Sequence, residues 1–151
     1  MTNRDIAALT LGAEQTWMNH WLAGPTHVGH PVGRGDKAPD LVLTSEGGSS
    51  VALSSVWKNA TALVMLWRHL GCGCGLDRIV RLKDEYDQYL AAGMNVVVVA
   101  PGDIERVVAY KERYELPTPV LADPDYTSHK AFGLSHWSRE QVLYDAPDEF
   151  C

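Results

Sequence analysis

The sequence predicts an α/β domain built on a central, largely parallel sheet flanked by helices, and three observations favour it. Residues 60–67 and 95–100 are short apolar runs with the length of buried strands. Each run is followed by a segment whose apolar residues recur with helical spacing. A glycine-interrupted stretch at 41–53 precedes both and is typical of a β-hairpin.

The chain begins with a predicted helix and a connector. Residues 3–23 carry apolar side chains on one helical face, which Gly24-Pro25 ends, and the face includes Trp17 and Trp21. We expect these two tryptophans to pack in the core or at an interface. Residues 24–39 show no periodicity and are predicted to wrap the domain as a loop. The chain therefore divides into an N-terminal helix and connector, 1–34, and a folded domain, 35–151.

The folded domain continues as alternating strands and helices. Residues 60–67 are expected to form a strand at the sheet centre, buried on both faces. A broad apolar stripe predicts a helix over 76–90 that Gly93 closes, and Asp103 is placed to cap the next helix. The other predicted elements are strands at 95–100, 120–122 and 141–145 and helices at 103–114 and 126–132.

Composition and charge exclude several classes of protein. A formal net charge of −6 leaves no basic surface of the kind a nucleic-acid binder needs. The apolar runs are too short to span a membrane, and the N-terminus shows no charged-then-apolar leader. Three cysteines in 151 residues do not suit a secreted disulfide scaffold. We therefore expect a cytoplasmic protein that binds neither nucleic acid nor membrane.

Side-chain chemistry is concentrated at Cys72 and Cys74, in a glycine-rich turn between a predicted strand and a predicted helix. Free N–H groups and the positive dipole end of that helix would stabilise a thiolate, which is the reactive form of cysteine. Cys72 is the candidate nucleophile toward a peroxide or a disulfide, and Cys74 is the candidate resolving thiol. Gly73 and Gly75 supply the backbone freedom that so tight a disulfide requires. The alternative is that both cysteines are small buried core residues.

The same cluster leaves a metal-binding hypothesis open. His69, Cys72 and Cys74 place three nitrogen and sulfur donors within six residues. They would suit zinc with a fourth ligand from elsewhere, or Cu(I) bound by thiolates. We favour redox chemistry and predict no metal or other cofactor. Cys151 is either a further resolving thiol or an exposed terminal residue.

Three segments resemble blocks of a known superfamily, in the right order and spacing. They are 35–41 (GDKAPDL), 66–72 (LWRHLGC) and 118–134 (TPVLADPD running on to KAFGL). Together they resemble the peroxiredoxin-like (AhpC/TSA-type) branch of the thioredoxin-like superfamily, with a C-x-C in place of the usual cysteine motif. The resemblance implies a thioredoxin-like mixed sheet flanked by helices. It also implies a thiol-dependent oxidoreductase that uses Cys72 and Cys74.

The resemblance implies roles for residues near the cysteines as well. Arg68 would keep Cys72 ionised or orient a peroxide oxygen, and His69 would tune the thiolate or supply a proton. Thr118 and Pro119 would form a loop beside the thiols. A thioredoxin-like or low-molecular-weight thiol would donate the electrons to the peroxide or disulfide substrate. We also expect the protein to form a homo-oligomer.

The chain departs from the typical peroxiredoxin pattern near the cysteines. His69 and Met65 stand where a Thr or Ser and a Pro are usual, so the common peroxide-binding constellation is absent. Only Gly73 separates the two cysteines, where the peroxiredoxin-like branch typically has two residues. These differences bear on the activity more than on the fold.

The C-terminal edge of the predicted sheet suggests a second possible function for the chain. Arg139 precedes the last predicted strand, where peroxiredoxins often carry another active-site arginine, although a solvated surface charge is the alternative. Relatives continue with a further strand and helix, so the edge is expected to be open, covered by the N-terminal segment or completed by a partner, unless the sequence is truncated. An open edge would suit a non-catalytic binding or interaction module of the same fold.

Overall fold

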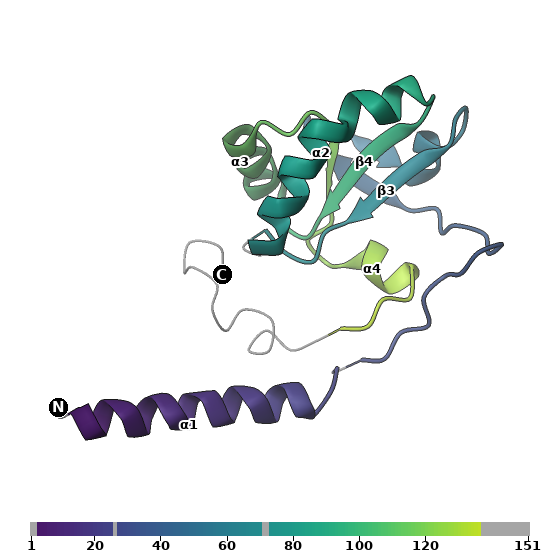
Figure 1. Ribbon diagram of the computed structural model, residues 1–151. Coiled ribbons are helices and arrows are strands. Elements are labelled where there is room, and N and C mark those ends of the chain that lie inside the picture. The colour runs from purple at the N-terminus through teal and green to yellow at the C-terminus, as the bar shows by residue number, and fades with distance from the viewer. Residues whose placement is uncertain (1–2, 26, 71–72, 137–151) are drawn as a thin grey trace.

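The computed structural model of the chain describes residues 3–25, 27–70 and 73–136 (Figure 1). A long helix comes first, a hairpin follows, and strands then alternate with helices. The helices are α1 (Asn3–Leu22), α2 (Gly73–Ala91), α3 (Ile104–Tyr114) and α4 (Thr127–Ala131), with a 3-10 turn, η1 (Leu53–Val56). The strands are β1 (Val42–Ser45), β2 (Ser50–Ala52), β3 (Ala62–Leu66), β4 (Asn95–Ala100) and β5 (Val120–Ala122).

The five strands form one mixed sheet in the order β2-β1-β5-β4-β3. β3, β4 and β5 run parallel to one another, whereas β1 is antiparallel to both β2 and β5. The predicted hairpin is confirmed, with Val42 opposite Ala52. The predicted α/β order of strands and helices is confirmed too.

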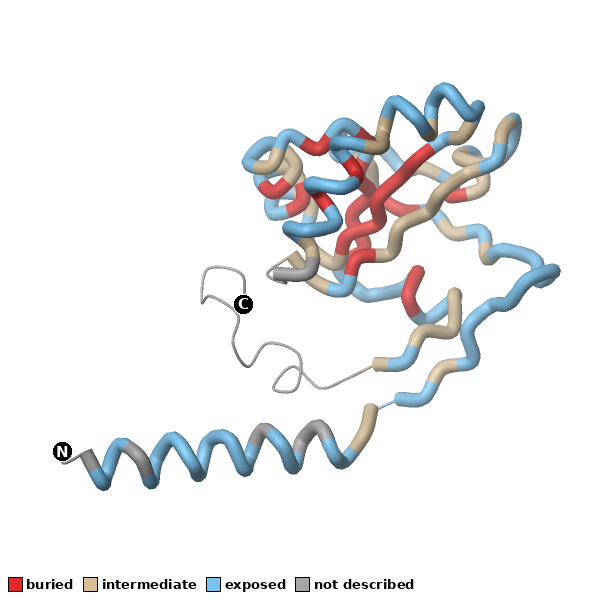
Figure 2. Tube along the Cα trace, viewed as in Figure 1, coloured by how far each residue is buried: buried red, intermediate tan, exposed pale blue. Residues whose placement is uncertain are grey.

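β4 is buried along most of its length, as its run of valines predicts (Figure 2). Its residues from Val96 to Ala100 alternate between two apolar layers because successive side chains of a strand point to opposite faces. Val98 packs with α2 and α3, whereas Val97 and Val99 pack on the other face with Leu53 of η1.

β3 differs from the prediction. In the described part of the chain it lies at the edge of the sheet, pairs with β4, and has five half-buried residues. The sequence placed this strand at the sheet centre with both faces buried. An apolar run indicates that side chains avoid water, but it does not identify the strands on either side. The predicted strand at 141–145 lies outside the described residues.

The helix ends follow the predicted capping residues. The Asp103 carboxylate accepts the N–H of Arg106 at 2.9 Å and so caps α3. Gly93 follows α2 with φ 72° and Gly133 follows α4 with φ 68°. Glycine adopts this left-handed conformation without the penalty of a Cβ. The sequence did not predict that Tyr110 would be the buried aromatic residue of α3.

α1 is confirmed as a helix and lies apart from the sheet and its covering helices (Figures 1 and 2). Ile6 and Leu9 are 48% and 63% exposed, so the predicted apolar face is not part of the core at these positions. The side chains of Trp17 and Trp21, expected to be packed, lie outside the described ones. Neither α1 nor any other helix in the described ranges has the length and apolarity to cross a bilayer.

The connector runs along the domain as a loop, as predicted, and reaches the end of α4. His27 and His136 form an isolated antiparallel bridge with backbone hydrogen bonds of 3.2 and 2.9 Å. The two backbones come so close that a Cβ on Gly29 would lie 2.0 Å from the carbonyl oxygen of Gly133. Residues 27–32 are therefore built onto the end of α4, a long-range contact for which the sequence carries no periodic signal.

Candidate functional site

The carboxyl ends of β3, β4 and β5 meet at one edge of the sheet, above α4 in Figure 1. Crevices that bind ligands form at this edge in open parallel sheets. Trp67, Arg68 and His69 follow β3 directly, and Asp123 follows β5. Most of the predicted chemistry therefore belongs to the loops at this edge.

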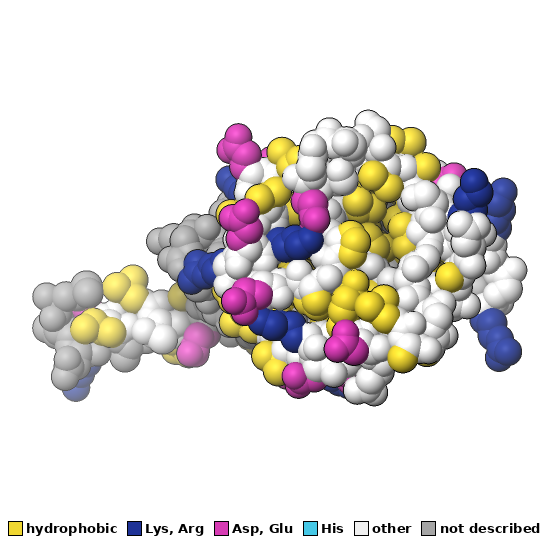
Figure 3. Space-filling model, turned by 90° about the horizontal axis from the view of Figure 1, so that it is seen from above, with side chains coloured by type: hydrophobic (Ala, Val, Ile, Leu, Met, Phe, Trp, Pro, Cys, Tyr) yellow, Lys and Arg dark blue, Asp and Glu magenta, His cyan; other side chains and the backbone are white. Residues whose placement is uncertain are grey.

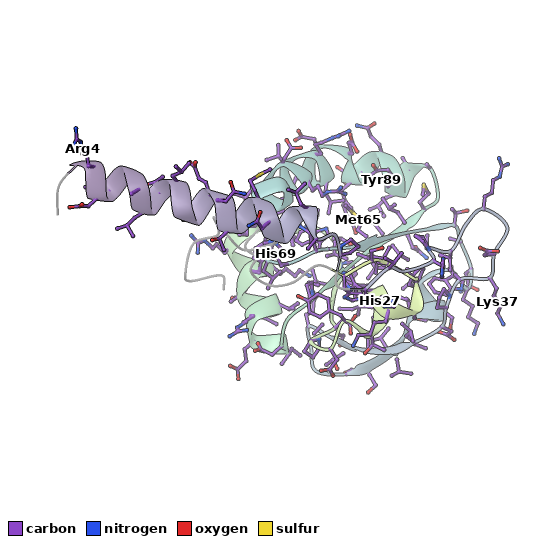
Figure 4. All side chains as sticks on the ribbon, turned by 90° about the horizontal axis from the view of Figure 1, so that it is seen from below. Arg4, His27, Lys37, Met65, His69 and Tyr89 are labelled. Carbon is purple, nitrogen blue, oxygen red and sulfur yellow. The ribbon has the colours of Figure 1, made fainter. Side chains whose placement is uncertain are left out.

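The structure describes some of the predicted site residues and not others. Arg68 is exposed at the end of β3, and the next residue, His69, is half-buried. His69 is labelled in Figure 4. Cys74 is the second residue of α2, but its side chain lies outside the described ones. Cys72 and Arg139 also lie outside the described residues. The geometry of the two thiols therefore stays a prediction.

Thr118 and Pro119 lie at the wrong end of the sheet for the role predicted for them. β5 pairs Val120 with Val98, so Thr118 stands beside the start of β4. Its buried hydroxyl donates to the carbonyl oxygen of Val96 at 2.7 Å. The end of β3 that leads to Arg68 is the opposite end of the parallel strands. The two residues therefore close the amino end of β5, at the opposite end of the strands from Arg68.

A groove of about 360 Å³ opens at that same amino end. Figure 3 views this end of the molecule and shows apolar side chains gathered over it. The groove is lined by Val56, Tyr86, Leu90 and Pro119, among others. It lies away from Arg68 and His69, so it is not the candidate site.

A buried polar cluster that sequence reasoning missed stands behind the site turn. Asp123 is 2% exposed, with buried Ser128 and His129 beside it. The Asp123 carboxylate accepts the N–H groups of Thr127 and Ser128, each at 2.8 Å, and the hydroxyl of Ser128. His129 Nε2 lies 2.8 Å from the carbonyl oxygen of Trp67. The cluster therefore joins the start of α4 to the end of β3.

Asp123 is held in its ionised form. Burial raises the pKa of this carboxyl group, but other effects outweigh burial. Hydrogen bonds from the Ser128 hydroxyl, from the backbone N–H groups of Ser128 and Thr127, and the neighbouring His129 bring the pKa below its ordinary value of 3.8. The ionised carboxylate therefore accepts all three of these hydrogen bonds and has no proton to donate.

Aromatic and imidazole rings pack around His129. The Tyr126 ring lies 5.2 Å from the His129 ring and 6.2 Å from that of His136, and His27 lies 5.8 Å from His136. Burial, followed by the charges of His27, His129 and Lys130, lowers the pKa of His136. Within the described residues, no three His, Cys, Asp or Glu side chains are grouped to hold a metal ion. The thiols of the metal hypothesis lie outside that search, so the hypothesis stays untested.

Trp67 and Tyr110 meet on the helix-covered face of the sheet, with ring centroids 5.6 Å apart. The Trp67 indole nitrogen and the Tyr110 hydroxyl are buried, and neither has a hydrogen-bond partner among the described residues. Burial, with a smaller effect of Tyr114, raises the pKa of Tyr110 to about 12. The hydroxyl therefore stays protonated at neutral pH and carries an uncompensated desolvation cost of about 1–3 kcal/mol.

Tyr110→Phe is expected to raise the free energy of unfolding by about 1 kcal/mol, because the ring contacts stay and the unpaired hydroxyl is removed. Tyr89→Phe is the matched control, since the Tyr89 hydroxyl donates to Glu85 at 2.6 Å and its removal offers no such gain. Urea denaturation of the two variants measures the difference. A loss of stability in Tyr110→Phe would mean that a buried water or a residue outside the described ranges already satisfies the hydroxyl.

Comparison with known proteins identifies the family. The model of the AhpC/TSA family matches residues 34–146. The chain belongs to the AhpC/TSA family. It is 29% identical over 105 residues to the thioredoxin-like protein AAED1 of Arabidopsis thaliana chloroplasts, covering 68% of this chain and 42% of that protein. It is 26% identical over 100 residues to peroxiredoxin Bcp of Bacillus subtilis, covering 66% and 63%.

A solved structure supports the fold of this AhpC/TSA domain. Peroxidoxin BcpB from Mycobacterium tuberculosis superposes with a TM-score of 0.60 at 14% identity, covering 74% of this chain and 73% of that one. The predicted thioredoxin-like, peroxiredoxin-like fold is therefore confirmed. The chain spans less than two thirds of the length of the two curated relatives above.

One part of the buried cluster in this AhpC/TSA domain could have been predicted from the sequence. Asp123 comes directly after a buried strand, and Thr127 and Ser128 stand where the next helix begins. A carboxylate in this position is well placed to accept the free N–H groups of a helix start. The contact of His129 with Trp67, 62 residues earlier, has no such signal, because it depends on the packing of α4 beneath the sheet.

Proposed function

We propose that this protein is a thiol-dependent oxidoreductase that reduces a peroxide or a disulfide through Cys72, with Cys74 as the resolving thiol. Membership of the AhpC/TSA family and a relative named as a peroxiredoxin support the reaction class. The order of elements carries the proposal to these residues, since Cys72 stands in the sequence between β3 and the start of α2 at Gly73. A thiol next to the start of a 19-residue helix would meet its free N–H groups and its dipole.

The proposed peroxide reaction proceeds in three balanced steps. The Cys72 thiolate attacks one peroxide oxygen, the O–O bond breaks, and the other oxygen takes a proton and leaves as an alcohol or water. The Cys74 thiol then attacks the sulfenic sulfur of Cys72, which releases water and forms a disulfide. Two thiols of a thioredoxin-like or low-molecular-weight donor reduce this disulfide and become a disulfide themselves.

Arg68 and His69 are the proposed supporting groups. A guanidinium at the end of β3 would attract the thiolate and orient a peroxide oxygen. His69 stands where typical peroxiredoxins carry a hydroxyl residue, so its imidazole would donate to the leaving oxygen. Arg139 stays a further candidate, while Thr118 and Pro119 have no part in this proposal.

Intact-mass analysis after brief treatment with hydrogen peroxide tests the proposal. The wild type and Cys151→Ser are each expected to lose two hydrogen atoms as the disulfide forms. Cys74→Ser is expected to retain a sulfenic acid on Cys72 that a sulfenic-acid trap captures, and Cys72→Ser is expected to stay unmodified. Thiols that stay unmodified at peroxide doses that slowly oxidise free cysteine would overturn the peroxide reaction.

Two further measurements test the alternatives. A non-catalytic interaction module would retain its partner binding in Cys72→Ser, and a metal-binding protein would contain stoichiometric metal when purified without chelator. The cytoplasmic location, the homo-oligomer and the identity of the thiol donor stay predictions. Gel filtration of the reduced and oxidised forms tests self-association.

A further inference from the structure

His129 is a buried imidazole enclosed by groups from several elements. The residue is 6% exposed, and its ring faces the carbonyl oxygen of Trp67 at the end of β3. Asp123, at the end of β5, and Ser128, beside it on α4, flank the other nitrogen. The Tyr126 ring packs on His129, and the charges of His129 and of exposed Lys130 both act on His136, whose ring packs on Tyr126.

The hydrogen-bond partners define where the protons of this cluster lie. A carbonyl oxygen only accepts, so His129 Nε2 carries a proton and donates it to Trp67. Asp123 is ionised, so the single hydroxyl proton of Ser128 is donated to its carboxylate. The Ser128 oxygen then presents only lone pairs to the second imidazole nitrogen.

Among the described residues, the groups that flank the second nitrogen of His129 are therefore both acceptors. Nδ1 lies 3.3 Å from the Ser128 oxygen and 3.7 Å from Asp123 Oδ2. A bare Nδ1 would set its lone pair against both, which is costly in a buried site. A protonated Nδ1 donates to Ser128 and gives the buried carboxylate a counter-charge.

We infer that His129 is held as a doubly protonated imidazolium, paired with Asp123, and that it is a positioning residue for the turn that carries Arg68 and Cys72. The Trp67 peptide is held from two sides, since its N–H donates to the Val99 carbonyl at 2.9 Å while its own carbonyl accepts from His129. These two hydrogen bonds therefore fix the position of the Trp67 peptide, from which the turn begins. The effect on Cys72 rests on the proposed function, whereas the charge state of His129 does not.

A buried cation near the site also acts through space. The pKa of His136 is lowered, so His136 does not compete as a second cation near neutral pH. Asp123 offsets much of the charge of His129, and the remaining dipole places its positive end toward β3. A positive field at the start of the cysteine turn favours a thiolate over a thiol.

NMR of the imidazole nitrogens of the wild type tests the charge state without any variant. At about pH 7.5 an ordinary histidine is mostly neutral. We expect both nitrogens of His129 to give the signals of protonated imidazole at that pH. Asp123→Asn is expected to return Nδ1 to the unprotonated range, because the counter-charge is gone. An unprotonated Nδ1 in the wild type would overturn the inference, whatever the enzymatic activity.

The rate of alkylation of Cys72 tests the positioning role. The background is Cys74→Ser with Cys151→Ser, so that only one thiol reacts with iodoacetamide. His129→Gln keeps a donor for Trp67 but removes the charge. We expect it to move the pH profile of alkylation upward and to slow the reaction at neutral pH about three- to tenfold.

Lys130→Gln is the matched control, since it removes an exposed charge one residue away and leaves the Trp67 contact intact. Equal profiles in the two variants would overturn the positioning role. Alkylation consumes no peroxide, so a shifted profile in a protein without peroxidase activity would refute the proposed function and leave this inference standing. If His129→Gln does not fold, the nitrogen signals of the wild type still decide the charge state.

Discussion

Gly133→Ala is expected to lower the free energy of unfolding by more than about 3 kcal/mol and to expose residues 27–32 to proteolysis. The φ of 68° would cost an alanine about 1–2 kcal/mol on its own. A Cβ at this position would also lie 2.0 Å from the carbonyl oxygen of His30 and 3.1 Å from the nitrogen of Pro31. Backbone atoms cannot turn aside as a side chain can, so the connector must leave the end of α4.

Substitutions at two other glycines distinguish the two causes of this loss, the left-handed φ and the close approach of backbone atoms. Gly93 has a φ of 72° and open space within 4 Å of the place a Cβ would take, so Gly93→Ala is expected to cost only the conformational penalty of about 1–2 kcal/mol. Gly29→Ala supplies the close approach without the left-handed backbone. Urea denaturation and limited proteolysis are expected to show a released connector in the Gly29 and Gly133 variants alone. Equal losses in the Gly93 and Gly133 variants would contradict the close approach.

The fold could be predicted largely from local pattern. Valine runs, glycine helix ends and the Asp103 cap are each determined by neighbours in the sequence, and the structure confirms them. The position of β3 in the sheet was wrong for the described residues, because strand order depends on contacts between distant segments. Periodicity likewise predicted an apolar face on α1, and Ile6 and Leu9 on that face are exposed, since periodicity predicts a face and not what covers it.

The location of a site residue could be predicted only where it follows from the residue's position next to a strand in the sequence. Arg68 and His69 follow β3, so their place at the carboxyl end of a parallel strand follows from the strand itself. Thr118 and Pro119 were misplaced because a proline before a strand marks the amino end of that strand, away from this edge. His129 was missed because a histidine on a short helix carries no signal of burial until the helix is packed against β3.

Asp123→Ala is expected to lower the free energy of unfolding by about 3–5 kcal/mol. The substitution leaves two backbone N–H groups and the Ser128 hydroxyl without their acceptor in a buried place. It also leaves His129 without the carboxylate at 3.7 Å. Urea denaturation at neutral pH measures the loss. Asp125→Ala is the matched control, because this exposed carboxylate is two residues away and the backbone oxygen that Lys130 binds is retained.

The pH dependence of the same variant tests the ionised state of Asp123. Because the pKa of Asp123 in the folded protein lies below its ordinary value of 3.8, the stability it contributes is fully present above 3.8. That contribution is lost as the pH falls through the lowered folded-state value. As the pH is lowered from neutral, the difference in unfolding free energy between wild type and Asp123→Ala should therefore begin to narrow at about pH 4. If the difference already narrows as the pH is lowered from 7 to 5, Asp123 takes up its proton early, and the counter-charge on which the imidazolium of His129 depends is removed.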